Sequence, residues 1–125
     1  MKNYRAGIDI GSTTVKLVVL DDENRIIYGN YRRHGAHTQK TLADLLKEAK
    51  EKLGNCTLSA RITGSGSINL GKALSIGFEQ EVVAVATALQ SVAPETDVAI
   101  ELGGEDAKII YFDKFIEQRM NGTCA

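Results

Sequence analysis

The fold is decided by the stretch AGIDIGSTTVKLVVL, which occupies residues 6–20. Two runs rich in β-branched residues flank the small polar residues 11–14, a pattern that predicts two antiparallel strands joined by a tight turn. A second polar turn at residues 21–24 leads into a third apolar run at 26–31. Three antiparallel strands are therefore expected to open the chain.

Helical and extended patterns alternate after these strands. Apolar residues recur at three- and four-residue steps over residues 38–53, which predicts a helix with Thr38 as its N-cap. A strand is predicted at 58–63, followed by a glycine loop and an irregular piece that reaches Gly77. Residues 79–92 are apolar on nearly every side, which predicts a buried helix. The chain is thus expected to be an α/β protein.

A second hairpin is predicted near the end of the chain. Strands are expected at residues 97–102 and 107–112, with the dipeptide Gly103-Gly104 as the turn between them. From residue 120 onward no helix or strand pattern completes the element. We therefore expect the chain to be the first part of a longer protein.

The composition excludes several classes of partner. Hydrophobic residues make up 43% and charged residues 25% of the chain, as in ordinary globular domains, so disorder is not indicated. The net charge of −1 offers no field that would attract nucleic acid or an acidic membrane surface. No stretch has the length of a membrane helix, and the first residues do not form a signal peptide. We expect a cytoplasmic protein without nucleic-acid or membrane partners.

The first glycine turn contains the residue types that hold a polyphosphate. Glycine lets the backbone approach a phosphate closely, while the amides and hydroxyls that follow donate to its oxygens. Asp9, at the end of the first strand, can hold magnesium through water. The alternative is an ordinary β-turn, because glycine, serine and threonine occur in turns of every kind. The predicted phosphate-binding residues here are Gly11, Ser12, Thr13, Thr14 and Lys16.

The second glycine turn repeats this arrangement. Glu101 lies in an apolar strand before Gly103 and Gly104, and Asp106 and Lys108 follow the turn. Two such hairpins could clamp one phosphate chain from opposite sides. The alternative is that these acids are charged turn residues in contact with solvent.

Four segments carry a resemblance to a known family. In order and spacing the chain resembles the activator ATPases of 2-hydroxyacyl-CoA dehydratases, 2-hydroxyglutaryl-CoA dehydratase among them, and the ATPase subunits of benzoyl-CoA reductase. These proteins are part of the superfamily of actin, sugar kinases and heat-shock chaperones. The four segments are GIDIGST at 7–13, TGSG at 63–66, GGEDAK at 103–108, and the terminal segment with MN at 120–121 and CA at 124–125.

The resemblance implies a fold of two ribonuclease-H-like lobes, each a mixed sheet with helices, and a cleft that binds ATP or ADP with Mg²⁺. Residues 1–95 would form the first lobe, with a phosphate loop at 9–16. Residues 96–125 would be the opening hairpin of a truncated second lobe, with a phosphate loop at 101–108.

The resemblance also assigns roles to single residues. Asp9 and Glu81 are the implied catalytic residues, with Glu81 orienting the attacking water. Glu101 joins Asp9 in holding magnesium through water, and the residues Gly103, Gly104 and Asp106 bind phosphate. An equally good reading of Glu81 is a first-turn glutamate stabilised by the helix dipole.

The two cysteines differ in what the resemblance implies for them. They lie far apart, so neither a disulfide scaffold nor a zinc site is supported. Cys124 matches the activator cysteine that ligates a 4Fe-4S cluster shared across a homodimer, whereas Cys56 matches no ligand. Each subunit of such a dimer gives two thiolates, so this chain alone is not expected to hold the cluster.

The implied activity is ATP-driven electron transfer. Hydrolysis in the full-length protein would drive low-potential electrons, received from a donor such as ferredoxin or flavodoxin, from the cluster to a dehydratase or a benzoyl-CoA-reductase-type partner. We do not expect this chain alone to be an active ATPase. A small-molecule kinase and a chaperone-like nucleotide switch of the same superfamily remain as alternatives. His34 and His37 lie in a polar loop and are expected to be exposed to solvent.

Overall fold

The computed structural model describes residues 1–103, 107–112 and 116–121. Contacts divide the chain into two compact units, Met1–Glu79 and Gln80–Ala125, and each is described by itself. The first unit ends at Glu79, whereas the boundary expected from the sequence follows residue 95. The segment between these two boundaries contains a single helix.

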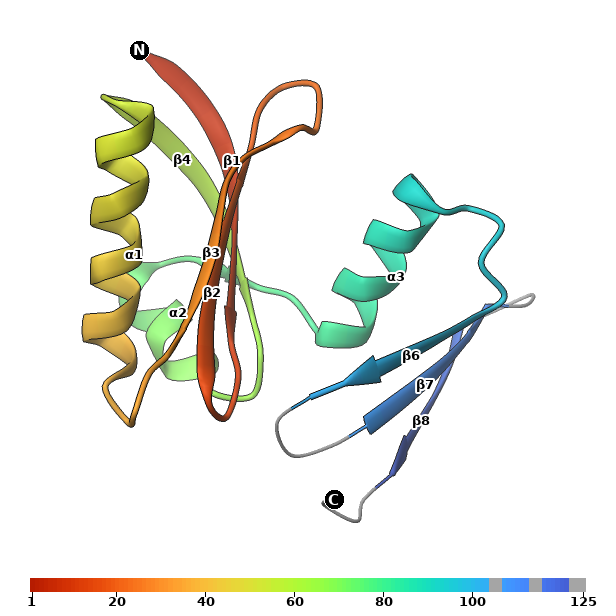
Figure 1. The fold of residues 1–125 in the computed structure, drawn as a ribbon. Helices are drawn as coiled ribbons and strands as arrows, with labels where there is room; N and C mark the ends of the chain where they lie inside the picture. The colour runs from red at the N-terminus through yellow and green to blue at the C-terminus, as the bar shows by residue number, and fades with distance from the viewer. Residues whose placement is uncertain (104–106, 113–115, 122–125) are drawn as a thin grey trace. The chain divides into compact units, whose positions relative to one another are not determined.

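The first unit is built on a five-stranded mixed sheet (Figure 1). The strand order is β3-β2-β1-β4-β5, in which β1, β2 and β3 are antiparallel neighbours while β4 runs parallel to β1 and β5 runs parallel to β4. The three opening strands predicted from the sequence are therefore confirmed. The strands are β1 (Lys2–Ile10), β2 (Thr14–Leu20), β3 (Ile26–Arg33), β4 (Cys56–Thr63) and β5 (Gly77–Phe78).

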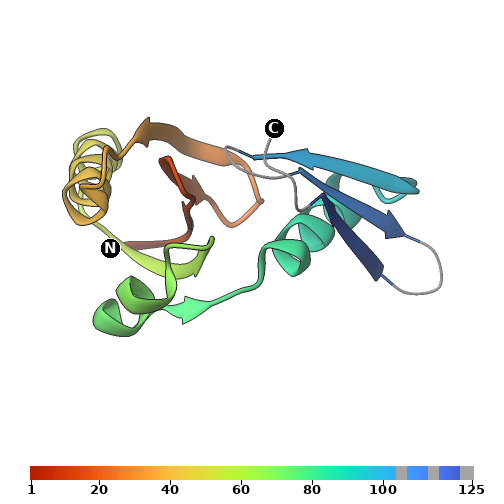
Figure 2. The same ribbon diagram turned by 90° about the horizontal axis from the view of Figure 1, so that it is seen from below.

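The core of this unit lies between the sheet and helix α1 (Thr38–Leu53), which runs along one face of the strands in both views (Figure 1, Figure 2). Alternate residues of β1 and β2 point into it, as expected for strands with one buried face. Each large aliphatic side chain buried in this way contributes roughly 1.5–3 kcal/mol. The central buried residues are Ile8, Ile10, Val15, Leu17, Val19, Leu42, Leu45, Ala49 and Ile62.

Two local expectations for this unit are wrong. The N-cap of α1 is His37 rather than Thr38, which is the first helical residue, and no side chain caps the helix. The segment expected to be irregular contains helix α2 (Ile68–Leu74). A Cβ atom at Gly71 would lie 2.9 Å from the Ile62 side chain, so this glycine allows close packing of the helix on the sheet and does not mark a turn.

The second unit contains helix α3 (Glu81–Val92) and a three-stranded antiparallel sheet of order β6-β7-β8. Its strands are β6 (Val98–Leu102), β7 (Ala107–Phe112) and β8 (Ile116–Asn121). The predicted hairpin is present, but β8 contradicts the expectation that no element completes the end of the chain. Its sequence, IEQRMN, has little β-propensity, and backbone pairing with β7 defines it instead.

The prediction that α3 is a buried helix is also wrong. Ala86 is its one buried residue, and the side chains of Val83 and Val92 are exposed. An apolar sequence specifies a preference for burial, but a residue is buried only where another element of the unit covers it.

Candidate functional site

The first glycine turn joins β1 to β2 within a continuous sheet. The Gly11 N–H donates to the Thr14 carbonyl at 2.9 Å, which closes the turn. Asp9 and Lys16 lie opposite each other in the strand register, and the Lys16 Nζ atom is 3.8 Å from the Asp9 Oδ2 atom. Ser12 and Thr13 are exposed at the tip. The sequence-predicted residues of the first turn are therefore gathered at one end of the sheet.

A loop after β4 packs against the base of this turn. Gly64 has a φ of +104°, and a Cβ atom there would lie 2.2 Å from the Ile10 carbonyl oxygen, so a larger residue cannot fit. The Gly66 N–H donates to that same Ile10 oxygen at 3.1 Å. The buried Ser67 hydroxyl donates to the Gly64 carbonyl at 2.7 Å. The loop thus fixes the point at which β1 enters the turn.

His34 supports the turn from the other side, a contact that no local sequence pattern predicts. Its backbone N–H donates to the Thr13 carbonyl at 3.0 Å, and its ring Nε2 atom lies 3.1 Å from the Gly11 carbonyl oxygen. The residue is half-buried, so the expectation of a solvent-exposed histidine is wrong. The signal that could have revealed it is its position directly after β3, beside the end of the turn in the antiparallel pair.

The turn presents backbone and hydroxyl donors beside one carboxylate and one ammonium group. No group of three or more histidine, cysteine or acidic side chains that could hold a metal occurs among the described residues. A site with a single carboxylate is compatible with magnesium, which keeps several waters and takes further oxygens from a bound phosphate. A Cβ atom at Gly11 would meet nothing closer than 3.8 Å, so packing within the chain does not require glycine there.

In the second unit, α3 and the hairpin bring together three charged residues. Lys108 is buried on β7, and its ammonium group forms an ion pair with the carboxylate of Glu81, the first residue of α3. Glu101 lies directly opposite Lys108 in the β6–β7 register, so the two side chains are on the same face of the sheet. Two predicted acids, Glu81 and Glu101, therefore lie near one lysine.

The other predicted residues of the second turn are only partly described. Gly103 follows β6 and is exposed. Gly104 and Asp106, predicted to bind phosphate, and Cys124, predicted as a cluster ligand, lie outside the described residues.

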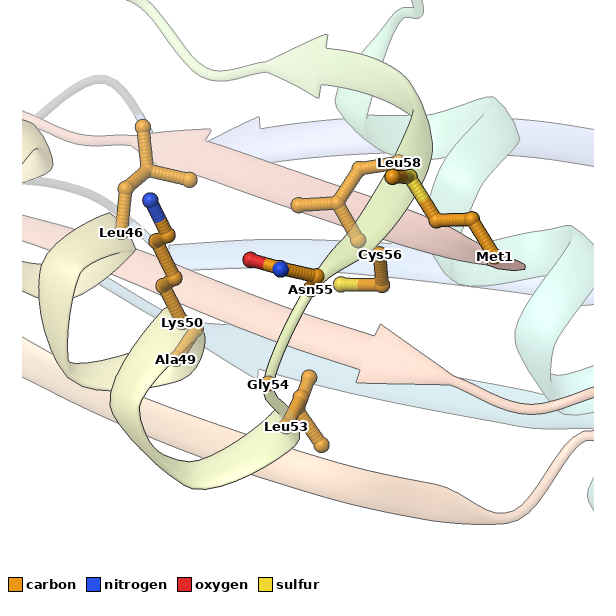
Figure 3. Close-up of a pocket in the computed structure, with 9 residues that line it drawn as sticks. All are labelled: Met1, Leu46, Ala49, Lys50, Leu53, Gly54, Asn55, Cys56 and Leu58. Carbon is orange, nitrogen blue, oxygen red and sulfur yellow. The ribbon is translucent and has the colours of Figure 1, made fainter.

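The hollow in Figure 3 is remote from the first turn. It has a volume of about 290 Å³ and lies between the end of α1 and the start of β4, with Met1, Leu53 and Cys56 in its lining. Met1 precedes β1 and the turn follows it, so the whole strand separates the two places. None of the predicted site residues lines this hollow.

No helix in the described part of the chain is long and apolar enough to cross a membrane. No protein-family model matches the chain.

Two curated relatives are dehydratase activators. The 2-hydroxyisocaproyl-CoA dehydratase activator of Clostridioides difficile is 31% identical, and the match covers 98% of this chain and 47% of the relative. The (R)-2-hydroxyglutaryl-CoA dehydratase activating ATPase of Acidaminococcus fermentans is 26% identical, with 100% and 49% covered. The chain spans about half the length of the curated relatives it matches.

Two solved structures that are similar to the chain are also of dehydratase activators. The activator of the 2-hydroxyisocaproyl-CoA dehydratase from Clostridium difficile, with bound ADPNP, has a TM-score of 0.84 and 29% identity, covering 98% of this chain and 47% of that one. The Acidaminococcus fermentans (R)-2-hydroxyglutaryl-CoA dehydratase component A has a TM-score of 0.79 and 26% identity, covering 99% and 49%. The chain is a homologue of these dehydratase activators over about half of their length, and over that part it has their actin-like ATPase fold.

Proposed function

We propose that this chain is the phosphate-binding part of an ATP-hydrolysing activator that drives low-potential electron transfer to a 2-hydroxyacyl-CoA dehydratase or a benzoyl-CoA-reductase-type partner. The observation that carries the proposal is the first glycine turn. Its carbonyls accept hydrogen bonds from the loops on both sides of it, and its tip is exposed. An acid and a lysine, Asp9 and Lys16, lie at its base. Similarity to two dehydratase activators over nearly the whole chain supports the same reading.

In this proposal the first turn binds the phosphates of ATP. The backbone amides and hydroxyls of Ser12, Thr13 and Thr14 donate to phosphate oxygens, and Lys16 adds positive charge. Asp9 holds the magnesium ion through water, and that ion would neutralise charge on the phosphates. A Cβ atom at Gly11 would have only ordinary van der Waals contacts within the chain, so its glycine leaves room for the close approach of a ligand. The bound ADPNP in the Clostridium difficile structure supports a nucleotide as that ligand.

The second hairpin is proposed to bind phosphate and magnesium as well. Gly103, Gly104 and Asp106 are proposed to bind phosphate, and Glu101 is proposed to hold magnesium through water. Glu81 is proposed to orient the attacking water, and its ion pair with Lys108 supports a fixed position for that carboxylate.

The remaining parts of the proposal concern the full-length protein. Cys124 is proposed as one of two cysteines per subunit that hold a 4Fe-4S cluster in a homodimer, which would supply the transferred electron. A dehydratase component is the proposed acceptor, with ferredoxin or flavodoxin as donor. Support comes from the two relatives, which are activators of dehydratases.

Anaerobic iron-sulfur reconstitution of the full-length protein tests the proposal. We expect about four irons per dimer, together with ATP-dependent activation of a 2-hydroxyacyl-CoA dehydratase. The Cys124→Ser variant should lose the iron, and the matched Cys56→Ser variant should keep it. Nucleotide binding without iron or activation would contradict the activator role and favour a kinase or a nucleotide switch.

A further inference from the structure

We infer that His34 is a positioning residue for the phosphate-binding turn: it aims backbone N–H groups of the turn at the phosphates. The inference rests on the proposed role of that turn. It assigns a task to a residue outside the glycine motif, on the loop between β3 and α1.

Two hydrogen bonds define the state of the His34 ring, and a third comes from the His34 backbone. The Ala36 N–H donates to the ring Nδ1 atom at 3.1 Å, so Nδ1 is an acceptor and the ring proton is on Nε2. The Nε2–H group then donates to the Gly11 carbonyl oxygen, 3.1 Å away. The His34 backbone N–H donates to the Thr13 carbonyl at 3.0 Å. One residue therefore holds two carbonyls of the turn.

Peptide geometry converts these contacts into the direction of two N–H groups. In a planar trans peptide the carbonyl and the N–H of the next residue point in opposite directions. Holding the Gly11 carbonyl toward His34 aims the Ser12 N–H away from it, and holding the Thr13 carbonyl aims the Thr14 N–H likewise. Donation to the Gly11 carbonyl also polarises that peptide, which makes the Ser12 N–H a stronger donor.

The loop after β3 is shaped to keep the ring in place. Gly35 and Ala36 both have left-handed backbone conformations, with φ values of +51° and +68°, and these turn the Ala36 N–H back onto the ring. The His37 N–H donates to the His34 carbonyl at 2.7 Å and closes the loop. A left-handed alanine is uncommon and persists only where the surrounding structure fixes it. The loop conformation therefore orients His34 before any ligand binds.

Substitutions separate the ring contact from a general effect on the loop. Glutamine places an amide nitrogen where Nε2 lies and keeps the donor to Gly11, whereas asparagine places one near Nδ1 and alanine places none. His37 is the matched control, because it lies in the same loop and its ring makes no hydrogen bond among the described residues. Amide spectra of β1 and β2 verify that each variant is folded.

The affinity of the 125-residue chain for magnesium-ADPNP, measured by amide NMR titration, tests the inference. We expect His34→Ala and His34→Asn to bind about five- to tenfold more weakly, while His34→Gln and His37→Ala stay near the wild type. Nitrogen NMR of the ligand-free chain should show the Nε2–H tautomer of His34.

Two results would overturn the inference and leave the proposed function intact. They are an Nδ1–H tautomer of His34, or equal affinity of the wild type, His34→Ala and His34→Gln. Failure of the wild-type chain to bind at millimolar concentration would instead overturn the proposed phosphate site, and the inference with it.

Discussion

The two glycine turns share a sequence pattern but are held in different ways. At the first turn, carbonyls of Ile10, Gly11 and Thr13 accept hydrogen bonds from neighbouring loops, and the adjoining strands bury their apolar side chains almost completely. At the second turn, the β6 residues Ile100 and Leu102 are 68% and 79% exposed. There the buried group next to the turn is a charged one, Lys108.

This difference shows what each turn depends on. Backbone hydrogen bonds and close glycine contacts fix the first turn, so its shape is sensitive to the size of the residues that pack on it. The second hairpin depends on charge, because Lys108 pairs with Glu81 at the start of α3 and lies opposite Glu101 on β6. Steric changes should therefore damage the first turn, and charge changes should damage the second.

The largest effect is expected from Gly64→Ala. The new Cβ atom would lie 2.2 Å from the Ile10 carbonyl oxygen, and the backbone φ of +104° disfavours any L side chain. We expect the first unit to lose about 3 kcal/mol or more of its unfolding free energy. Urea unfolding followed at β1 and β2 amides measures it. Gly7→Ala, where a Cβ atom would meet nothing within 4 Å, is the control and should be nearly neutral.

Lys108→Met should destabilise the second unit by roughly 2 kcal/mol at neutral pH, since it leaves the carboxylates of Glu81 and Glu101 without this cation. Hydrogen exchange of β6 and β7 amides measures the change. Lys40→Met, which breaks the exposed Lys40–Asp44 pair, should cost only a few tenths of a kcal/mol. Equal costs at the two lysines would refute the role of charge in the second hairpin.

Gly11→Ala separates ligand binding from stability. Its Cβ atom would meet only ordinary contacts, at 3.8 and 3.9 Å, so the unfolding free energy should change by less than about 0.5 kcal/mol. The added methyl group should hinder the approach of phosphate and weaken magnesium-ADPNP binding by about tenfold. Titration calorimetry and urea unfolding of the same variant provide both values. Unchanged affinity would show that the ligand does not approach at this residue.

The smallest effect concerns the β2–β3 turn, which lies at the opposite end of β2 from the first glycine turn. A hydrogen bond from the Arg25 backbone N–H is the main cause that lowers the pKa of Asp21, whose carboxylate also accepts from the Glu23 N–H. Because the folded-state pKa is lowered, this stabilisation is present above the ordinary aspartate range near 3.9 and is lost as pH falls through the lowered pKa.

Asp21→Asn should therefore speed exchange of the Arg25 amide at neutral pH and have little effect in strong acid. Asp22→Asn, at the next residue of the same turn, is the control. Equal exchange rates of the Arg25 amide in the two variants would contradict this account of Asp21.

Local sequence patterns were sufficient to predict most of the first unit. The two runs rich in β-branched residues around the polar residues 11–14 predicted β1 and β2, and the spacing of Leu42, Leu45 and Ala49 predicted α1. Helix α2 was missed because Gly71, which reads as a turn residue, serves a close helix–sheet contact. Strand β8 was missed because pairing with β7 defines it.

The candidate site was predictable where a local motif carries it. Asp9 and the first turn were predicted from consecutive residues. His34 was not, because its contact with Gly11 depends on the strand register and on a left-handed loop that no short pattern reveals. The Glu81–Lys108 pair joins residues 27 apart in sequence, and neither residue signals the other.

The most direct test of the central claim is an amide NMR titration of this chain with magnesium-ADPNP, with adenosine as the control that lacks phosphates. We predict that ADPNP shifts the amides of Gly11, Ser12, Thr13, Thr14 and Gly66, and that adenosine leaves them unchanged. Unchanged chemical shifts of these amides at millimolar ADPNP, or equal shifts with adenosine, would contradict the claim that the first glycine turn binds the phosphates of ATP.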